Sequence, residues 1–248
     1  LKAEEVSDRE ADDFISKKLG GWSIDKEVAK KDLRKAIKIY LALEKIIDER
    51  KFNAVSMKCV YGLPIYYDIT PCVPLALAGA EVPVVCESDV LGLVTELMME
   101  YVSGQRSVYL EFYDIFEDRV LMGVCGMIPT SALKDTPRIY RYAWGKLTGL
   151  MTLGSMKTGK VTLARLASAG DRYTMHVTVA EAVKPRDWHE IGWQLEAPVY
   201  PSLEVVLGNR TKEFTKNILA QHYHLVYGDY TNELVDLCKL LKIDLVMT

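Results

Sequence analysis

The chain lacks long hydrophobic runs, an excess of charge of either sign, and cysteines in metal-binding pairs. Its longest apolar stretch, residues 71–86, is interrupted by Pro74, Gly79, Glu81 and Pro83, so no segment reaches the roughly 18 apolar residues that a membrane helix needs. Thirty-one basic against 34 acidic residues give a formal net charge of −3, which does not favour binding to nucleic acid or to an anionic membrane surface. We therefore expect neither nucleic acid nor a membrane as a partner.

The five cysteines are odd in number, widely spaced and without a C-x-x-C pattern. This distribution argues against a disulfide framework and against a structural zinc site, and it is typical of reduced thiols in the cytoplasm. The acidic, polar opening LKAEEVSDREADD is unlike a signal peptide. We therefore expect a cytoplasmic protein, and the missing initial Met indicates a processed chain or a piece of a longer one.

What is present is the composition of a globular protein, with 248 residues of which 49% are hydrophobic and 26% charged. The first part alternates helix and strand: an amphipathic helix within 26–50, short strands at 52–60 and 81–86, and a helix from Val90 that Ser103-Gly104 ends. Residues 61–80 read as a loop with some helix. This order predicts a partial parallel α/β/α layer over a first domain, 1–104.

The pattern changes after Gly104, where short stretches of period-two alternation are separated by turn residues. They predict mainly antiparallel strands in a β-barrel, followed by a short helix at 211–220 and a terminal amphipathic helix with Thr231 as its N-cap. The predicted fold class is therefore α/β plus β, with residues 105–248 as the barrel domain.

Two carboxylates, those of Glu87 and Glu111, are candidate functional groups because of their positions in the predicted strands. Glu87 lies where a predicted strand ends and a helix begins, the edge at which open α/β sheets bind ligands. The alternative is that Glu87 and Asp89 only stabilise the positive end of that helix. Glu111 alternates with Leu110 and Phe112 in a predicted strand, so it either faces water or is held there for a function.

His222 and His224 share one face of a predicted strand and could both bind a metal. An equally good interpretation is a pair of half-buried, hydrogen-bonded imidazoles. His176, in an alternating strand, and His189, in a loop that contains Trp188, are interpreted as structural or surface residues.

Residues 154–160, GSMKTGK, nearly match the phosphate-binding loop GxxxxGK[ST]. Val161 stands where that motif requires a magnesium-binding hydroxyl. The following VTLARL has a strand pattern, whereas the motif needs a helix whose N-terminus faces the phosphates. A nucleoside triphosphatase is therefore a minor alternative.

Several segments, taken in order, resemble the L-fucose isomerase and L-arabinose isomerase family, and are closer to its fucose-isomerase-like members. The resemblance covers nearly the whole chain and implies a barrel domain preceded by two α/β domains, of which this chain would hold only part of the second. The segments are MKC (57–59), PC (71–72), CESD (86–89), YLEFY (109–113), MGVCG (122–126), GKVTLARL (159–166) and QHYHLVYGD (221–229).

Such enzymes interconvert aldoses and ketoses through an enediol at a divalent metal, usually Mn²⁺. The resemblance implies a small-molecule sugar as partner, a trimer or hexamer of the full-length protein, and a set of site residues. Glu87 and Glu111 would be metal ligands and acid–base groups, and His222 the third ligand. Contacts to the sugar would come from Tyr113, Trp188 and His224, with Trp193 as a further wall and His224 also as the reserve ligand.

One position departs from the family pattern. Val124 stands where many members carry a His, which is a fourth metal ligand in the arabinose enzymes. The main alternative is therefore a non-catalytic relative that binds a sugar or a metal. The sequence does not identify the sugar.

Overall fold

The computed structural model describes residues 2–59, 62–144, 147–193 and 200–248. Packing divides the chain into two compact units: residues 1–89 with 125–155, and residues 90–124 with 156–248. Each unit is described by itself below. The domain division at residue 104, expected from the change in sequence pattern, stays a prediction.

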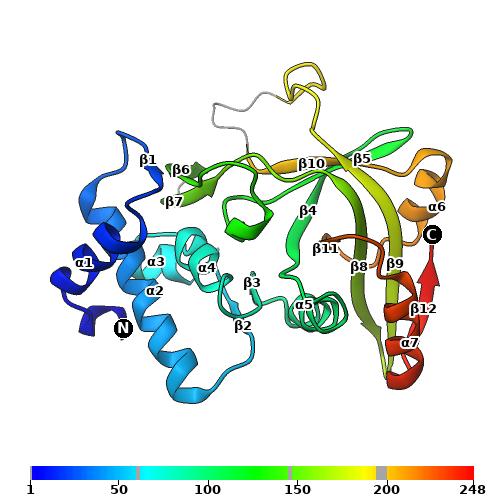
Figure 1. Cartoon of the computed structure of the whole chain (residues 1–248), viewed down its shortest axis with the longest axis horizontal. Helices are drawn as coiled ribbons and strands as arrows, with labels where there is room; N and C mark the ends of the chain where they lie inside the picture. Colours follow the sequence, from blue (N-terminus) through cyan, green and yellow to red (C-terminus); the bar gives the residue numbers. More distant parts are fainter. Residues whose placement is uncertain (1, 60–61, 145–146, 194–199) are drawn as a thin grey trace. The chain divides into compact units, whose positions relative to one another are not determined.

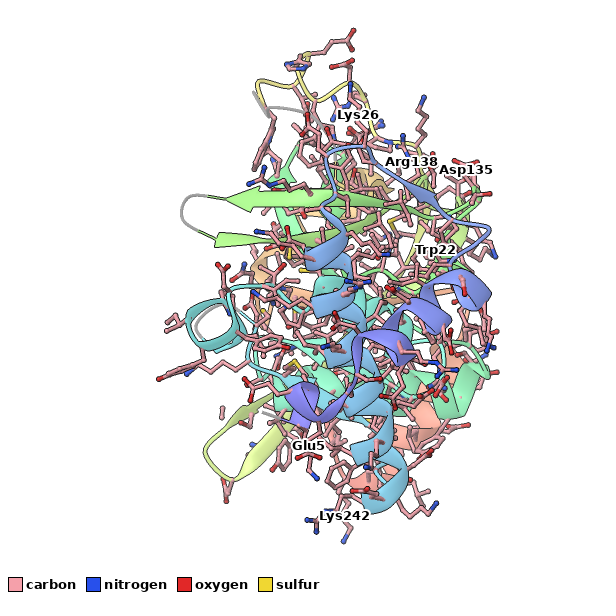
Figure 2. The ribbon with its side chains drawn as sticks, turned by 90° about the vertical axis from the view of Figure 1, so that its left-hand side faces the viewer. Glu5, Trp22, Lys26, Asp135, Arg138 and Lys242 are labelled. Carbon is pink, nitrogen blue, oxygen red and sulfur yellow. The ribbon has the colours of Figure 1, made fainter. Side chains whose placement is uncertain are left out.

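The first unit begins with the short helix η1 (Lys2–Glu5), followed by α1 (Asp8–Lys18) and α2 (Lys30–Arg50). Ser7 caps α1 by accepting a hydrogen bond from the backbone N–H of Glu10, whose side chain bonds back to Ser7. Helix α1 lies across α2 (Figure 2), and Arg34 on α2 donates two hydrogen bonds to Asp12 on α1. Helix α2 confirms the amphipathic helix that the sequence predicted within 26–50.

A pair of parallel strands forms the sheet that the sequence pattern predicted in this unit. Strand β2 (Val55–Met57) pairs in parallel with β3 (Val84–Cys86), and Met57 lies opposite Cys86. Their connection contains α3 (Leu63–Tyr67) and α4 (Cys72–Ala78). Parallel strands need such a helical crossover, because a tight turn can join only antiparallel neighbours.

A second small sheet completes the first unit. It joins β1 (Ser23–Ile24), β6 (Arg138–Trp144) and β7 (Leu147–Leu153), with the helix η2 (Thr130–Ala132) before it. The sequence placed residues 138–153 with the barrel strands, and this was wrong. Ile139 and Leu150 are buried in one core with Ala36 and Ile37 of α2. A period-two pattern marks a strand but does not identify the surface on which it packs.

The second unit contains a seven-stranded sheet in the order β10-β5-β4-β11-β8-β9-β12, in which only β12 pairs in parallel. Strand β10 also pairs with β9, so the sheet is strongly curled. The mixed α/β composition and the mostly antiparallel sheet agree with the sequence analysis, whereas a closed barrel stays a prediction. The strands are β4 (Val108–Ile115), β5 (Arg119–Gly123), β8 (Gly159–Ala169), β9 (Arg172–Val183), β10 (Ser202–Val206), β11 (His222–Tyr227) and β12 (Asp244–Met247).

Four helical segments accompany this sheet: α5 (Val90–Ser103), η3 (Gly208–Arg210), α6 (Thr211–Lys216) and α7 (Thr231–Leu241). Met98 and Met99 of α5 and Leu234 of α7 are buried in one core with strand residues such as Val177. Figure 1 shows α7 running beside β9 and β12.

Two details of these helices differ from the sequence analysis. Tyr101 follows Met98 by three residues, a spacing that predicts a place on the apolar face of α5, but it is 73% exposed. The N-cap of α7 is Tyr230, and Thr231 is its first helical residue. The carboxylate of Asp229 accepts a hydrogen bond from the Thr231 N–H, the first N–H of the helix. Within the described part of the chain, none of the helices combines the length and the hydropathy that crossing a membrane requires.

Candidate functional site

Glu111 and His222, which are far apart in sequence, lie directly opposite each other on neighbouring antiparallel strands. Glu111 of β4 pairs with His222 of β11. The Phe112 N–H donates a hydrogen bond to the Gln221 carbonyl beside this pair. That pattern defines a non-hydrogen-bonded pair, in which the Cα atoms typically lie about 4.5 Å apart and the side chains are close. The carboxylate and the imidazole therefore share one face of the sheet.

Neighbouring side chains hold this pair in place. The Gln221 amide donates a hydrogen bond to Glu111 Oε2 at 3.1 Å. The ring of Tyr109 stacks on His222, with centroids 4.3 Å apart and an interplanar angle of 11°. His222 is 7% exposed, so packing fixes the plane of its imidazole.

His224 lies two residues along the same strand, on the same face, opposite Tyr109. It is fully buried, and its Nδ1 is 2.7 Å from Ser107 Oγ. The structure therefore gives His224 the hydrogen-bonded, buried environment that the sequence analysis offered as the alternative to metal binding. Its roles as a reserve ligand and a substrate contact stay predictions.

A β-bulge follows Glu111 on the same strand. The register between β4 and β5 shifts between Phe112 and Asp114, which leaves Tyr113 as the extra residue. Bulges re-aim side chains and occur often beside active sites. The aromatic rings predicted as sugar contacts come together here, since the Tyr113 ring lies 5.4 Å from Trp188 and 6.0 Å from Trp193. Trp188 is 3% exposed, and its indole N–H has no partner among the described residues.

Glu87 belongs to the first unit, directly after β3. Glu87 and Ser88 have φ of 62° and 60°, a left-handed conformation that residues other than glycine seldom adopt. Such strain concentrates at functional sites. Partial burial, and then the charge of Asp89, raise the pKa of the Glu87 carboxyl. The convergence of Glu87 with Glu111 and His222 stays a prediction.

The sequence analysis missed two cysteines beside Glu87. The ligand atoms of Cys59, Cys86 and Glu87 all lie within 4.8 Å of one another. The hydrogen bond between the two thiols lowers the pKa of Cys59 and raises that of Cys86. Short-range spacing contains no signal for this group, because the parallel pairing of β2 and β3 brings the two cysteines together.

The remaining candidates behave as structural residues. Residues 154–158 lead into strand β8, which begins at Gly159, so the strand pattern that argued against a phosphate-binding loop is confirmed. His176 is fully buried between Tyr223 and Thr248, as a structural histidine would be. Val124 is buried directly after β5, and its aliphatic side chain cannot bind a metal.

No protein-family model matches the chain. Two curated proteins do, the sulfoquinovose isomerases of Priestia aryabhattai and Priestia megaterium, each 24% identical over 212 residues. The chain is similar to a sugar isomerase. The matched region covers 82% of this chain and 45% of each relative, so the chain spans about half the length of the proteins it matches. This similarity agrees with the sugar-isomerase part of the resemblance and does not distinguish the fucose and arabinose type.

Proposed function

We propose that this chain is the site-bearing part of a metal-dependent aldose–ketose isomerase of the fucose and arabinose isomerase type, with its curled sheet as that family's barrel domain. The observation that carries the proposal is the cross-strand pair of Glu111 and His222, found in a chain similar to sulfoquinovose isomerases. The similarity supports a sugar as the substrate. It leaves the identity of the sugar, and the assembly of the whole protein into a homo-oligomer, to experiment.

The described residues fit a hard divalent cation such as Mn²⁺. Glu111 and His222 present a carboxylate and an imidazole on one face of the sheet, and oxygen ligands with imidazole suit Mn²⁺. Glu87 would be the third ligand. A divalent cation bound there would polarise the sugar carbonyl and stabilise the charge that develops on its oxygen.

The protein's own groups would move the proton. A carboxylate, Glu111 or Glu87, would take the proton from C2 and return it to C1. The C2 hydroxyl would give up its proton and the former carbonyl oxygen would gain one, which converts an aldose to a ketose through an enediol. Gln221 would orient the Glu111 carboxylate through its hydrogen bond. The raised pKa of Glu87 would bring that carboxyl closer to the neutral range in which a group can both accept and donate a proton.

The aromatic cluster after the bulge would contact the sugar. Tyr113 and Trp188 lie together on the strand and loop next to Glu111. The indole N–H of Trp188, which has no partner among the described residues, would donate to a sugar hydroxyl. A buried donor without an acceptor costs about 1–3 kcal/mol. A polyhydroxylated ligand would supply that acceptor to the indole N–H.

A second candidate function is a non-catalytic relative that binds a sugar or a metal. The observation that favours it is Val124, a buried aliphatic residue where the arabinose enzymes have a metal-binding His. The second candidate is compatible with Mn²⁺ binding but does not require it, and only the first predicts turnover.

The test is ketose formation by the longest natural chain that contains this sequence. Mn²⁺ and a panel of pentoses, 6-deoxyhexoses and sulfoquinovose would be used, with chelator as the blank. We expect metal-dependent conversion of at least one sugar, and its loss in Glu111→Gln. The matched control is Glu117→Gln, at an exposed carboxylate beyond the same strand. Metal-independent turnover, or full activity of Glu111→Gln, would contradict the proposal. Metal binding without turnover on any sugar would favour the second candidate.

A further inference from the structure

The two cysteines beside Glu87 meet at one edge of the parallel strands. Cys86 is the last residue of β3 and pairs with Met57, the last residue of β2, and Cys59 follows Met57 by two residues. Both thiols are therefore at the carboxyl ends of parallel strands, where side chains converge on a ligand. Cys59 is 8% exposed and Cys86 is 4% exposed, whereas Glu87 lies at the surface.

The spacing of their ligand atoms suits a single metal ion. Two atoms bound to one Zn²⁺ are separated by at most the sum of two bonds, about 4.6 Å for two sulfurs and about 4.4 Å for sulfur and oxygen. The three ligand atoms already lie within 4.8 Å of one another. Small side-chain adjustments would therefore bring them into coordination distance.

The chemistry of the donors selects the kind of metal. Thiolates favour thiophilic ions such as Zn²⁺ and Cd²⁺, whereas Mn²⁺ favours carboxylate and imidazole. We propose that Cys59, Cys86 and Glu87 form a binding site for a thiophilic divalent cation. On binding, each thiol releases its proton to solvent and each sulfur donates an electron pair to the metal, with no change in oxidation state. Three protein ligands leave a fourth position for water or another ligand.

The site is distinct from the manganese site proposed above, with which it shares only Glu87. It does not require the chain to be an isomerase, because nothing in the argument depends on a sugar. If both proposals hold, a thiophilic ion that takes Glu87 would compete with Mn²⁺ for that carboxylate.

The test is a titration of the reduced chain with Cd²⁺, followed by the thiolate-to-cadmium charge-transfer absorption in the ultraviolet. We expect saturation at one equivalent in the wild type and loss of the band in Cys59→Ala and in Cys86→Ala. Glu87→Gln should bind at least roughly tenfold more weakly, because losing a ligand should cost no less than losing a group that only orients one. Cys238→Ala, at a buried cysteine of α7, is the matched control and should keep the band.

A band that survives in Cys86→Ala, or the absence of any band in the wild type, would overturn the proposal. If an alanine variant fails to fold, zinc-edge X-ray absorption of the wild-type chain gives the answer without variants. Two sulfur neighbours around bound Zn²⁺ would support the site, and none or four would contradict it. These readouts do not involve activity, so failure of the isomerase proposal would leave them unaffected.

Discussion

At the scale of single residues, Glu204 shows how the second unit accommodates a buried charge. Its carboxylate is fully buried on β10, with Arg119 Nη1 at 3.1 Å from one oxygen and Arg186 Nε at 2.6 Å from the other. A buried carboxylate that loses a partner retains its desolvation penalty. The charges of the two arginines therefore compensate the desolvation of the Glu204 carboxylate.

We expect Arg119→Met to lower the free energy of unfolding by about 2 kcal/mol, less than the full cost of an unpaired buried charge because Arg186 remains. Urea denaturation monitored by circular dichroism measures this. Arg172→Met is the control, since Arg172 pairs with Asp244 at the surface, where an ion pair contributes less than about 1 kcal/mol. Equal losses in the two variants would contradict the interpretation.

His176 should make stability depend on pH. Burial lowers its pKa from 6.5 to about 4, so the folded chain keeps it neutral where the unfolded chain would bind a proton. Its contribution is therefore complete above the unfolded pKa and is lost as pH falls from about 6.5 towards 4. Over this window, the free energy of unfolding of His176→Gln should fall less than that of the wild type, by up to about 3 kcal/mol. Urea denaturation at each pH from 7 to 4 measures the free energy of unfolding of the two proteins. An equal fall of that free energy in both would refute the prediction.

The candidate site could be predicted only in part at this scale. Residue types and positions identified Glu111 and His222 as candidates, but their pairing depends on the register between distant strands. The same holds for Cys59 and Cys86, because their wide spacing along the chain gave no sign that the two thiols lie together.

At the scale of elements, the sequence predicted some boundaries well and some partners poorly. Helix α5 runs from Val90 to Ser103 as expected, because a strand end precedes it and Gly104, with φ of 66°, follows it. Residues 138–153, which form β6 and β7, fell inside the predicted barrel domain but pair in a different sheet. Local residues determine where a helix ends, whereas the strand beside which another strand pairs depends on packing contacts between distant parts of the chain.

Gly123 at the end of β5 tests the packing beside the bulge. It lies opposite Glu111, and an added Cβ would collide with the Tyr113 ring and lie 2.8 Å from the Pro201 carbonyl oxygen. We expect Gly123→Ala to cost about 1–3 kcal/mol, because overpacking displaces neighbouring groups. Thermal unfolding measures the loss. Gly21→Ala is the control, since a Cβ there meets nothing within 4 Å, and it should be neutral. An unchanged melting temperature of Gly123→Ala would contradict this prediction and show that the bulge adjusts to the added methyl group at little cost.

At the scale of the whole molecule, the order of segments along the chain predicted a sugar isomerase, and the similarity to two sulfoquinovose isomerases agrees with it. The two packing units are not continuous in sequence, because residues 125–155 belong to the first unit although residues 90–124 belong to the second. Such a return depends on contacts between distant segments, which composition and periodicity do not encode.

Mn²⁺ should raise the melting temperature of the chain, because an ion that binds only the folded state stabilises it by mass action. Glu87→Gln and His222→Ala should lose this response, whereas Cys86→Ala should keep it, since the thiols belong to the other proposed site. Without metal, Glu87→Gln should melt close to the wild type. Differential scanning calorimetry with and without Mn²⁺ measures each case. A manganese response that is equal in all variants would exclude these ligands.

Strand β12 has a consequence for the behaviour of the protein in concentrated solution. It pairs with Thr174–Val177 of β9 (Figure 1), while β10 pairs with residues 181–183 farther along the same strand. Detaching residues 244–248 would uncover the backbone donors and acceptors of β9, and an open edge of that kind is a template for pairing with another copy. Residues 244–248 therefore cover this part of β9, and we expect a proteolytic cut before Asp244 to increase self-association, which light scattering would measure.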